Sequence, residues 1–449
     1  MNSTRDHQPG GNVPPPPDPL VIGLDVGGSS TRAVVVSLTG EQLGAGTADG
    51  GNPTSHGAEP AAERVRTALH TALGDLDPTR VRAGAIGLAG AGRWHHDPNT
   101  RAAYDRAWHD AGLRCRYDVH GDALVGYACA TPTPDGTVLI AGTGAIAAQV
   151  RQLRLHRVAD GHGWLLGDAG SGFWLGREAV RHTLAALDAH PAPADGVRPG
   201  PLDPPRAQLD PAQAQHDPAQ AQLDPAQAQL DPAQAQHDPA QAQHDPARAR
   251  PSPLSALVLT ELLGSAELTG PPRQLVGELI RAATVRPPVA LARLAPLVFR
   301  AARDGDPAAR ALVDSAAEQL VASVTRVRPA GDSTPIVLGG GLLSAPTPTA
   351  PPGPPPPGAA PIGAASSGVA SPDAASPDAA SPDAASIGAA PIGGEGPLTR
   401  AVATSLARQW PQAPLLIAGD GAVGAAWLAA RTLPEVTDPV ELHRWLRHY

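Results

Sequence analysis

Residues 20–38 read LVIGLDVGGSSTRAVVVSL, an apolar run, a glycine-rich turn and a run of β-branched residues. This pattern predicts a strand over Leu20–Asp25, a turn at Gly27–Ser30 and a second strand over Thr31–Leu38. A third strand near Gln42–Thr47 follows. The chain therefore opens with consecutive strands joined by tight turns, and an acidic residue ends the first of them.

Further along the chain, the spacing of apolar residues predicts more elements. The predicted helices are Glu59–Leu73, Thr100–Ala111, Ala123–Ala130, Leu254–Leu268, Arg273–Ala283, Val289–Arg303 and Ala308–Val327. The predicted strands are Ala83–Leu88, Arg114–Val119, Thr137–Ala141, Ala145–Arg151, Pro335–Leu338 and Pro414–Ala418. Strands and helices in this order indicate an α/β fold in which helices cover mixed sheets.

The composition excludes several classes of site. The 449 residues include 34 basic and 43 acidic side chains, giving a formal net charge of -9, and every basic residue is Arg. Without Lys, Schiff-base chemistry, a pyridoxal-phosphate anchor and a GxxxxGK[ST] phosphate loop are excluded. The two cysteines, Cys115 and Cys129, are too few for a four-thiolate metal site and form no disulfide framework, which fits a cytoplasmic protein.

The same composition bears on partners. The acidic balance argues against a general nucleic-acid binder. No apolar run reaches the roughly 18–20 residues that span a bilayer. We therefore expect no nucleic-acid partner and no membrane partner.

Two low-complexity segments interrupt the globular pattern. The first repeats DPAQAQ(L/H), and the second contains PPGPPPPG and copies of SPDAA. Pro in every heptad excludes a coiled coil, since each would destabilise a helix by about 3 kcal/mol. Both segments hold too little apolar surface to fold. The predicted organisation is a disordered leader at 1–19, an N-terminal domain at 20–131, a C-terminal domain at 132–190, 251–344 and 395–435, disordered inserts at 191–250 and 345–394, and a tail at 436–449.

Four glycine-rich turns each follow an apolar strand. They are LDVGGSSTR (24–32), LIAGTGAIA (139–147), IVLGGGLL (336–343) and LLIAGDGAVGAA (415–426). Gly after a strand lets backbone N–H groups approach an anion closely, and a helix behind the turn adds its dipole. One such turn is most often a plain tight turn, whereas four in this order indicate a nucleotide site. In a chain without Lys, the phosphates would be held by these amides, by Mg²⁺ and by Arg32.

Two aspartates stand in informative places. Asp25 ends the first predicted strand, where a carboxylate can face a phosphate-bound Mg²⁺ or, alternatively, cap the turn. Asp122 opens a helix directly after a strand. It can cap that helix, and it can also act as a general base that accepts a proton from a substrate hydroxyl.

Together these motifs resemble the N-acetylglucosamine kinase branch of the BadF/BadG/BcrA/BcrD ATPase family, within the actin-like sugar kinases. GLDVGGSSTRAVVV is similar to the first phosphate motif of that family, and IVLGGGLL is similar to its adenosine motif. VHGDALVGYACA resembles its catalytic-acid motif, and VLIAGTGAIAAQV resembles its second phosphate motif. GWLLGDAGSGFWLGREAV resembles the sugar-side GDxGS signature. The resemblance implies a two-domain actin-like ATPase (ribonuclease H-like) fold with a central cleft. It also implies ATP and Mg²⁺ as cofactors, and transfer of the γ-phosphoryl group to the 6-hydroxyl of an amino sugar.

The resemblance assigns roles to single residues. Asp122 would be the catalytic base that contacts the sugar hydroxyl, and Asp25 would organise Mg²⁺. Asn52, Asp168 and Ser171 would contact the sugar. The nucleotide would lie against Gly27, Gly28, Ser29, Thr31, Gly142, Thr143, Gly144, Gly339, Gly340 and Gly341.

Two departures from the family pattern leave the acceptor open. Ala145 stands where a hydroxyl-bearing residue often follows GTG, and Ala169 stands where an acid is common. N-acetylglucosamine is the first expectation, and glucosamine or another hexosamine is the alternative. An activator ATPase, with a cluster bridged by paired cysteines of two subunits, and a sugar-sensing regulator without catalysis are further alternatives. A homodimer is the default expectation for such folds.

Overall fold

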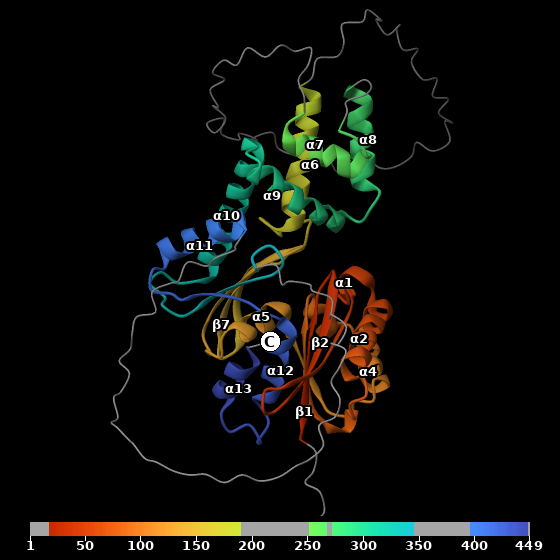
Figure 1. The fold of residues 1–449 in the computed structure, drawn as a ribbon, viewed down its shortest axis with the longest axis vertical. Helices are drawn as coiled ribbons and strands as arrows, with labels where there is room; N and C mark the ends of the chain where they lie inside the picture. The colour runs from red at the N-terminus through yellow and green to blue at the C-terminus, as the bar shows by residue number, and fades with distance from the viewer. Residues whose placement is uncertain (1–17, 190–250, 267–271, 345–395, 448–449) are drawn as a thin grey trace, which may run out of the picture.

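The computed structural model describes residues 18–189, 251–266, 272–344 and 396–447. Both predicted low-complexity inserts, and all but the end of the predicted leader, lie outside these residues. The described chain forms two five-stranded sheets with helices around and between them (Figure 1). The α/β class that the sequence predicts is therefore confirmed.

The first sheet has the strand order β3-β2-β1-β4-β5. Its strands are β1 (Leu20–Val26), β2 (Ser30–Ser37), β3 (Gln42–Asp49), β4 (Val81–Leu88) and β5 (Tyr117–Gly121). β1 pairs antiparallel with β2 and parallel with β4, and β4 pairs parallel with β5. Successive side chains of β1 point to opposite faces of the sheet. Leu20, Ile22 and Leu24 belong to one core cluster, so Asp25 lies on the other face together with Val21.

Helices cover the Leu20 face of this sheet and form the first lobe with it. They are α1 (Pro53–His56), α2 (Ala58–Leu73), the 3₁₀ turn Pro78–Arg80, α3 (Ala91–His96) and α4 (Pro98–Asp110). Leu69 of α2 and Tyr104 and Trp108 of α4 are fully or almost fully buried in the shared core. Burial of such large side chains supplies most of the stability of a layer of this kind.

The second sheet has the strand order β10-β9-β6-β7-β8. Its strands are β6 (Gly136–Ala141), β7 (Ala145–Arg151), β8 (Arg154–Asp160), β9 (Ile336–Gly339) and β10 (Leu415–Ile417). β6, β9 and β10 are parallel, and β7 and β8 extend the sheet antiparallel. The sequence patterns did not predict β8, because an edge strand can be mostly polar.

A helical group completes the second lobe (Figure 1). Its members are α6 (Gly172–Asp188), α7 (Pro253–Leu263), α8 (Pro272–Thr284), the 3₁₀ segment Pro288–Leu294, α9 (Ala295–Arg303), α10 (Pro307–Val327) and α11 (Pro397–Gln409). The single helix predicted over Val289–Arg303 is thus divided. Pro296 lacks the N–H that would continue the hydrogen-bond ladder across the junction. No helix in the described ranges is long and apolar enough to cross a lipid bilayer.

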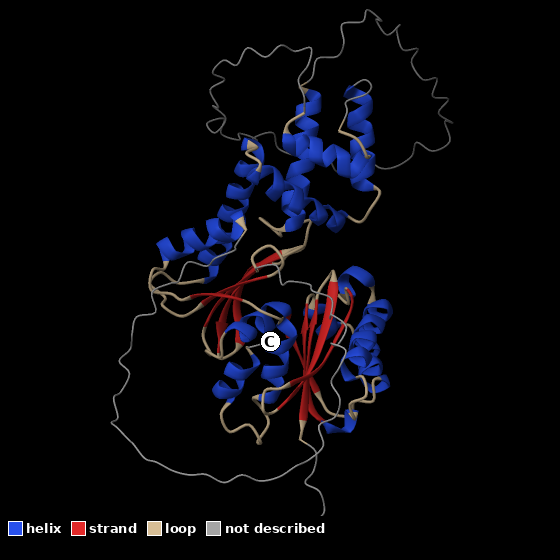
Figure 2. Ribbon diagram, viewed as in Figure 1, coloured by secondary structure: helices blue, strands red, loops and turns tan. Residues whose placement is uncertain are grey.

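Helices α5 (Asp122–Ala130), α12 (Gly421–Ala430) and α13 (Pro439–Leu446) lie between the two sheets, as Figure 2 shows. Their core cluster also takes in Val21 of the first sheet and Val138 of the second. The packing is close. A Cβ on Gly23 of β1 would stand 2.1 Å from the Ala422 carbonyl oxygen, and one on Gly424 would stand 2.1 Å from that of Val125.

This arrangement differs from the predicted domain boundaries. The prediction placed 395–435 in the C-terminal domain and left 436–449 as a tail. α11 and β10 lie with the second sheet, but α12 packs on β1 and β4, and α13 packs on α12. The physical reason is composition, since every residue of α12 is buried, and such a helix needs apolar neighbours on all sides.

Candidate active site

Asp25 and Asp122 lie at the same edge of the first sheet. Asp25 is paired with Gly87 of β4, and Gly87 is paired with His120 of β5. Two strand spacings separate Asp25 from His120, which corresponds to about 10 Å. Asp122 follows β5 directly as the first residue of α5. The carboxyl ends of three parallel strands therefore bring the two predicted functional acids to one place.

The first predicted phosphate turn joins β1 to β2. The Gly27 N–H donates to the Ser30 carbonyl at 2.9 Å, which closes the turn. Nε2 of His56, on α1, lies 3.0 Å from the Gly28 carbonyl oxygen. Thr31 does not point into this turn, because it is fully buried and its hydroxyl donates to the Asp49 carbonyl at 2.9 Å.

The second predicted phosphate turn joins β6 to β7. The Gly142 N–H donates to the Gly144 carbonyl at 2.8 Å. The start of α6 packs directly against this turn. The Gly172 N–H donates to the Gly142 carbonyl at 2.8 Å, and the Phe173 N–H donates to the Thr143 carbonyl at 3.1 Å. Two carbonyl oxygens of the turn are thereby hydrogen-bonded to the start of α6.

The two turns touch each other. The Ser29 and Thr143 hydroxyl oxygens are 3.2 Å apart, although 114 residues separate them in the chain. This contact brings the β1–β2 turn of the first lobe against the β6–β7 turn of the second. Both predicted phosphate turns thus contribute to one site.

Asp25 sits in a charged cluster. The Arg32 guanidinium donates to its carboxylate at 3.2 Å, and Arg32 Nε lies 3.7 Å from Asp420 Oδ1. Burial raises the pKa of Asp25 to about 6. The Arg32 charge acts against this shift, and the charges of Asp122 and Asp420 add to it. A divalent cation beside such a carboxylate would stabilise its ionised form. The cation would offset the cost of burying the charge and the repulsion from neighbouring acids.

Asp122 is half-buried at the N-terminus of α5. Its Oδ1 accepts the Ala123 N–H at 2.9 Å. Burial raises the pKa of Asp122, and that hydrogen bond acts in the opposite direction. A raised pKa makes a carboxylate a better proton acceptor, which suits a general base.

Asp420 is a site residue that sequence reasoning missed. It caps α12 by accepting the Ala422 N–H at 2.9 Å and shares Arg32 with Asp25. The next residue also borders the site, because a Cβ on Gly421 would stand 2.8 Å from Asp25 Cγ. The signal was present in LLIAGDGAVGAA, which has an acid between the glycines of the fourth turn. Only the fold shows that this turn lies against β1.

The sugar-side motif is built into the second turn. Asp168 is buried and accepts the Ala145 N–H at 3.0 Å. Asp160, another residue that the patterns missed, accepts the Asp168 N–H at 2.6 Å and the Ala169 N–H at 2.9 Å. Ser171 is fully buried and caps α6 through the Trp174 N–H. In this structure both predicted sugar residues therefore have structural partners.

Asn52 lies beside the first turn rather than within it. It caps α1, because its Oδ1 accepts the Thr54 N–H at 2.8 Å. A Cβ on Gly90 would stand 2.8 Å from the same oxygen, so Asn52 lies at the carboxyl end of β4. That is the edge at which Asp25 and Asp122 also lie.

The third predicted turn follows β9 and lies beside the second. The Leu342 N–H donates to the Ala141 carbonyl at 3.0 Å. A Cβ on Gly142 would stand 3.7 Å from the Gly341 nitrogen. Gly340 has φ 86°, a left-handed conformation that favours glycine. The triplet 339–341 therefore adjoins the second turn, as a nucleotide-binding role requires.

The aromatic residues of the sugar-side motif differ from one another. Phe173 is buried, whereas Trp164 is 39% exposed and meets Phe173 edge to face at 6.0 Å between ring centroids. Phe173 is therefore a core residue, whereas Trp164 is packed on one side only.

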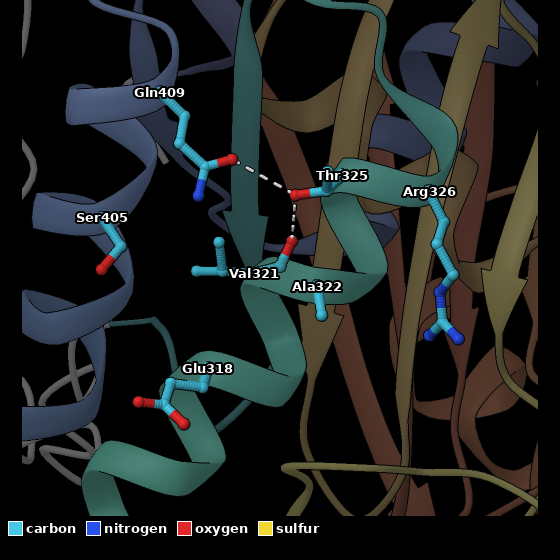
Figure 3. A pocket seen from close by; sticks show the side chains of 7 residues that line it. All are labelled: Glu318, Val321, Ala322, Thr325, Arg326, Ser405 and Gln409. Carbon is cyan, nitrogen blue, oxygen red and sulfur yellow. Dashed lines mark hydrogen bonds between the residues drawn. The ribbon is translucent and has the colours of Figure 1, made fainter.

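A pocket of about 460 Å³ lies on the other side of the second lobe, between α10 and α11 (Figure 3). Thr325 and Gln409 meet across it, with Thr325 Oγ1 3.2 Å from Gln409 Oε1. None of the residues that line it belongs to the four glycine turns or carries a predicted role. We therefore do not assign this pocket to the candidate active site.

Curated proteins resemble a part of this chain. N-acetyl-D-glucosamine kinase of Dictyostelium discoideum is 30% identical over 179 residues, which are 38% of this chain and 55% of that protein. Glucosamine kinase GspK of Vibrio cholerae is 28% identical over 185 residues, 40% of this chain and 56% of that protein. The chain thus matches little more than half the length of these curated relatives.

A solved structure and a family model extend the match. A candidate N-acetylglucosamine kinase of Chromobacterium violaceum has a TM-score of 0.50 and 22% identity, covering 73% of this chain and 88% of that one. This likeness confirms the two-domain actin-like α/β fold. The family model, described as BadF/BadG/BcrA/BcrD ATPase family, matches residues 22–347, which include three of the four glycine turns and both aspartates. The chain belongs to the BadF/BadG/BcrA/BcrD ATPase family.

Proposed function

We propose that this protein is an ATP-dependent sugar kinase that transfers the γ-phosphoryl group to the 6-hydroxyl of an amino sugar, with N-acetylglucosamine as the first candidate. The observation that carries the proposal is the contact between Ser29 and Thr143 beside Asp25 and Asp122. Two glycine turns that meet next to two aspartates provide amide donors for phosphates together with a proton acceptor. The curated relatives are named as kinases of N-acetylglucosamine and of glucosamine, which supports an amino sugar as acceptor.

The chain's residues divide the work in this proposal. Amides of Gly28, Ser29, Thr143 and Gly144 bind the terminal phosphates, because the Gly27 and Gly142 amides close their own turns. The triplet 339–341 lies against the adenosine. Asp122 orients the acceptor hydroxyl and takes its proton as the bond to phosphorus forms. Asn52 and Asp168 flank the acceptor. Closure of the two lobes excludes water that would otherwise compete for the phosphoryl group.

A divalent cation fits the residues present. Burial and neighbouring acids disfavour the negative charge of Asp25 when no cation is near. Mg²⁺ would supply that cation, and it prefers oxygen ligands such as a carboxylate. Asp25 would hold the ion. Arg32 lies between Asp25 and Asp420. When bound, Mg²⁺ supplies neutralisation of charge on the phosphate oxygens.

The activator-ATPase alternative is less well supported. A cluster shared between subunits needs cysteines at the protein surface, yet Cys129 is buried and Cys115 is only partly exposed. Cys129 also has another role. Its thiol contacts the Gly126 carbonyl, and its sulfur accepts the Gly419 N–H at 3.2 Å. A cytoplasmic location and a homodimer stay predictions from the sequence.

The test is an assay of ATP consumption with N-acetylglucosamine, glucosamine, N-acetylmuramic acid and glucose as acceptors. We expect ADP formation that depends on an amino sugar and on Mg²⁺. Phosphorus–proton correlation spectra of the product should place the phosphate on O6. ATP turnover that no sugar accelerates would favour the activator ATPase, and sugar binding without turnover would favour the regulator.

A further inference from the structure

His56 contacts the first phosphate turn although it lies 28 residues further along the chain. Its Nε2 lies 3.0 Å from the Gly28 carbonyl oxygen. Because a carbonyl oxygen only accepts hydrogen bonds, Nε2 must carry the proton in this contact. His56 is the last residue of α1, so a single imidazole ties that short helix to the turn.

A second contact fixes the same peptide unit. A Cβ on Gly50 would stand 2.0 Å from the Gly28 oxygen and 2.8 Å from the Ser29 nitrogen, so Gly50 lies directly on this peptide. The Gly50 carbonyl in turn accepts from the Arg64 guanidinium. The Gly28–Ser29 peptide therefore has neighbours on the carbonyl side that hold its orientation.

The orientation of the peptide decides where its amide points. In a planar trans peptide, the C=O of one residue and the N–H of the next point in opposite directions. With the Gly28 carbonyl directed at His56, the Ser29 N–H is directed away from His56. The Ser29 side chain contacts Thr143 of the second turn, so Ser29 borders the site between the turns.

We propose that His56 is a positioning residue that aims the Ser29 amide at the terminal phosphates of the bound nucleotide. The proposal rests on the proposed function only in requiring that a nucleotide phosphate binds at this turn. Asn52, which is predicted to contact the sugar, is the N-cap of α1, so this four-residue helix lies between a predicted sugar contact and the phosphate turn. His56 acts through the backbone of the turn and touches no reacting atom.

The experiment compares His56→Val, which removes the donor, with His56→Gln, whose side-chain amide can still donate to the carbonyl. His70→Val is the matched control, because His70 likewise stands in the last turn of a helix, but on α2 and with an exposed side chain. Calorimetry measures the Kd for the non-hydrolysable ATP analogue AMPPNP with Mg²⁺. Steady-state kinetics measures KM for ATP, KM for the sugar and kcat.

We expect His56→Val to raise the Kd for AMPPNP and the KM for ATP roughly 3- to 10-fold, as loss of one hydrogen bond does. KM for the sugar, kcat and the melting temperature should change little. His56→Gln should recover most of the affinity, and His70→Val should match the wild type. A merely structural role of His56 would not raise the KM for ATP alone, and it would not be restored by Gln.

Three results would overturn the proposal. One is wild-type affinity for AMPPNP in His56→Val, and another is equal weakening in the Val and Gln variants. The third is a wild-type protein that binds no AMPPNP, which would remove the proposed kinase function as well. A wild type that binds AMPPNP but phosphorylates no sugar would end the proposed function alone, and the calorimetry would still decide the role of His56.

Discussion

The two glycine turns that meet at the candidate site are supported in different ways. The β1–β2 turn is held by side chains, with His56 on the Gly28 carbonyl and Arg32 between Asp25 and Asp420. The β6–β7 turn is held by the backbone of α6, and Asp168 accepts a backbone N–H beneath it. The first turn depends on exposed or half-exposed polar groups, whereas the second is embedded in buried structure.

This difference indicates a division of roles. A turn fixed by helix backbone has few alternative arrangements, because its hydrogen bonds are lost only if the helix moves. A turn fixed by charged and imidazole side chains can respond to a bound cation or anion, since each contact is individually weak. The second turn therefore serves as the fixed support, and the first turn as the adjustable part of the site.

The largest expected effect is on kcat, from a substitution of Asp122 beside the first turn. Asp122→Asn should lower kcat by roughly 10²- to 10⁴-fold, because the amide cannot take the hydroxyl proton. The fold should persist, since Asn can still accept the Ala123 N–H through its oxygen. Steady-state kinetics and a melting curve check this, and near-normal turnover would remove Asp122 from its proposed role.

A pair of glycine substitutions compares the two turns directly. A Cβ on Gly144 would stand 2.7 Å from Asp168 Oδ1, whereas one on Gly28 would meet no atom within 4 Å. Gly144→Ala should therefore lower the free energy of unfolding by about 1–3 kcal/mol, and Gly28→Ala should leave it nearly unchanged. Urea denaturation measures both. Equal losses would show that the second turn is no more tightly embedded than the first.

Asp25 should make the first turn a source of instability at neutral pH. Its pKa in the folded protein, about 6, lies above the ordinary value of 3.8. Between these values the folded state binds more protons than the unfolded state, so the free energy of unfolding falls as pH rises through this window. Asp25→Asn should thus stabilise the metal-free protein by roughly 1–2 kcal/mol at pH 7.5 and by almost nothing near pH 4.

Asp306 is a control for Asp25, because its pKa is shifted in the opposite direction. Burial alone would raise its pKa, but N–H donors from Leu254, Ala309 and Ala308 bring the pKa below its ordinary value. Asp306→Asn should therefore destabilise the protein above about pH 4, and the difference from wild type should shrink as pH falls through the lowered pKa. Chemical denaturation over about pH 2–8 tests both variants. A destabilising Asp25→Asn at pH 7.5 would contradict the electrostatic account.

The smallest expected effect concerns the contact between the turns. Ser29→Ala, Thr143→Ala and the double variant form a cycle around the 3.2 Å hydroxyl pair. Because this pair is exposed, we expect a coupling of about 0.5 kcal/mol in the free energy of unfolding. A coupling of zero would mean that the two turns do not meet in the nucleotide-free protein in solution.

Much of the fold was predictable from periodicity. The strand over Ala145–Arg151 has the predicted bounds, and the helix ending at Val327 begins one residue before its predicted start. Elements that broke the patterns were missed. β8 is an edge strand whose residues are mostly polar, and α6 begins at Gly172 within a glycine-rich motif. α13 was mistaken for a tail, because its eight residues give little periodic signal.

The site was predictable where neighbouring strands end together. Asp25 lies near the end of β1 and Asp122 follows β5, and both strands pair parallel with β4, so their proximity could be inferred from the order of strands in the sheet. The contacts of Asp420 with Arg32, of Asp160 beneath Ala169 and of His56 with Gly28 depend on how distant segments pack. No local pattern carries that information, and such contacts emerge only from the assembled fold.

The position of α12 has a consequence for how the chain is made. Gly23 in β1 lies against Ala422 and Ala426, so one face of the first strand is covered by α12, which follows the strands of both sheets in the chain. Until residues 421–430 emerge from the ribosome, Val21 and Val34 lack one of the helices with which they form a core cluster. The first sheet therefore stays incompletely shielded, and exposed to wrong associations, until α12 has been translated.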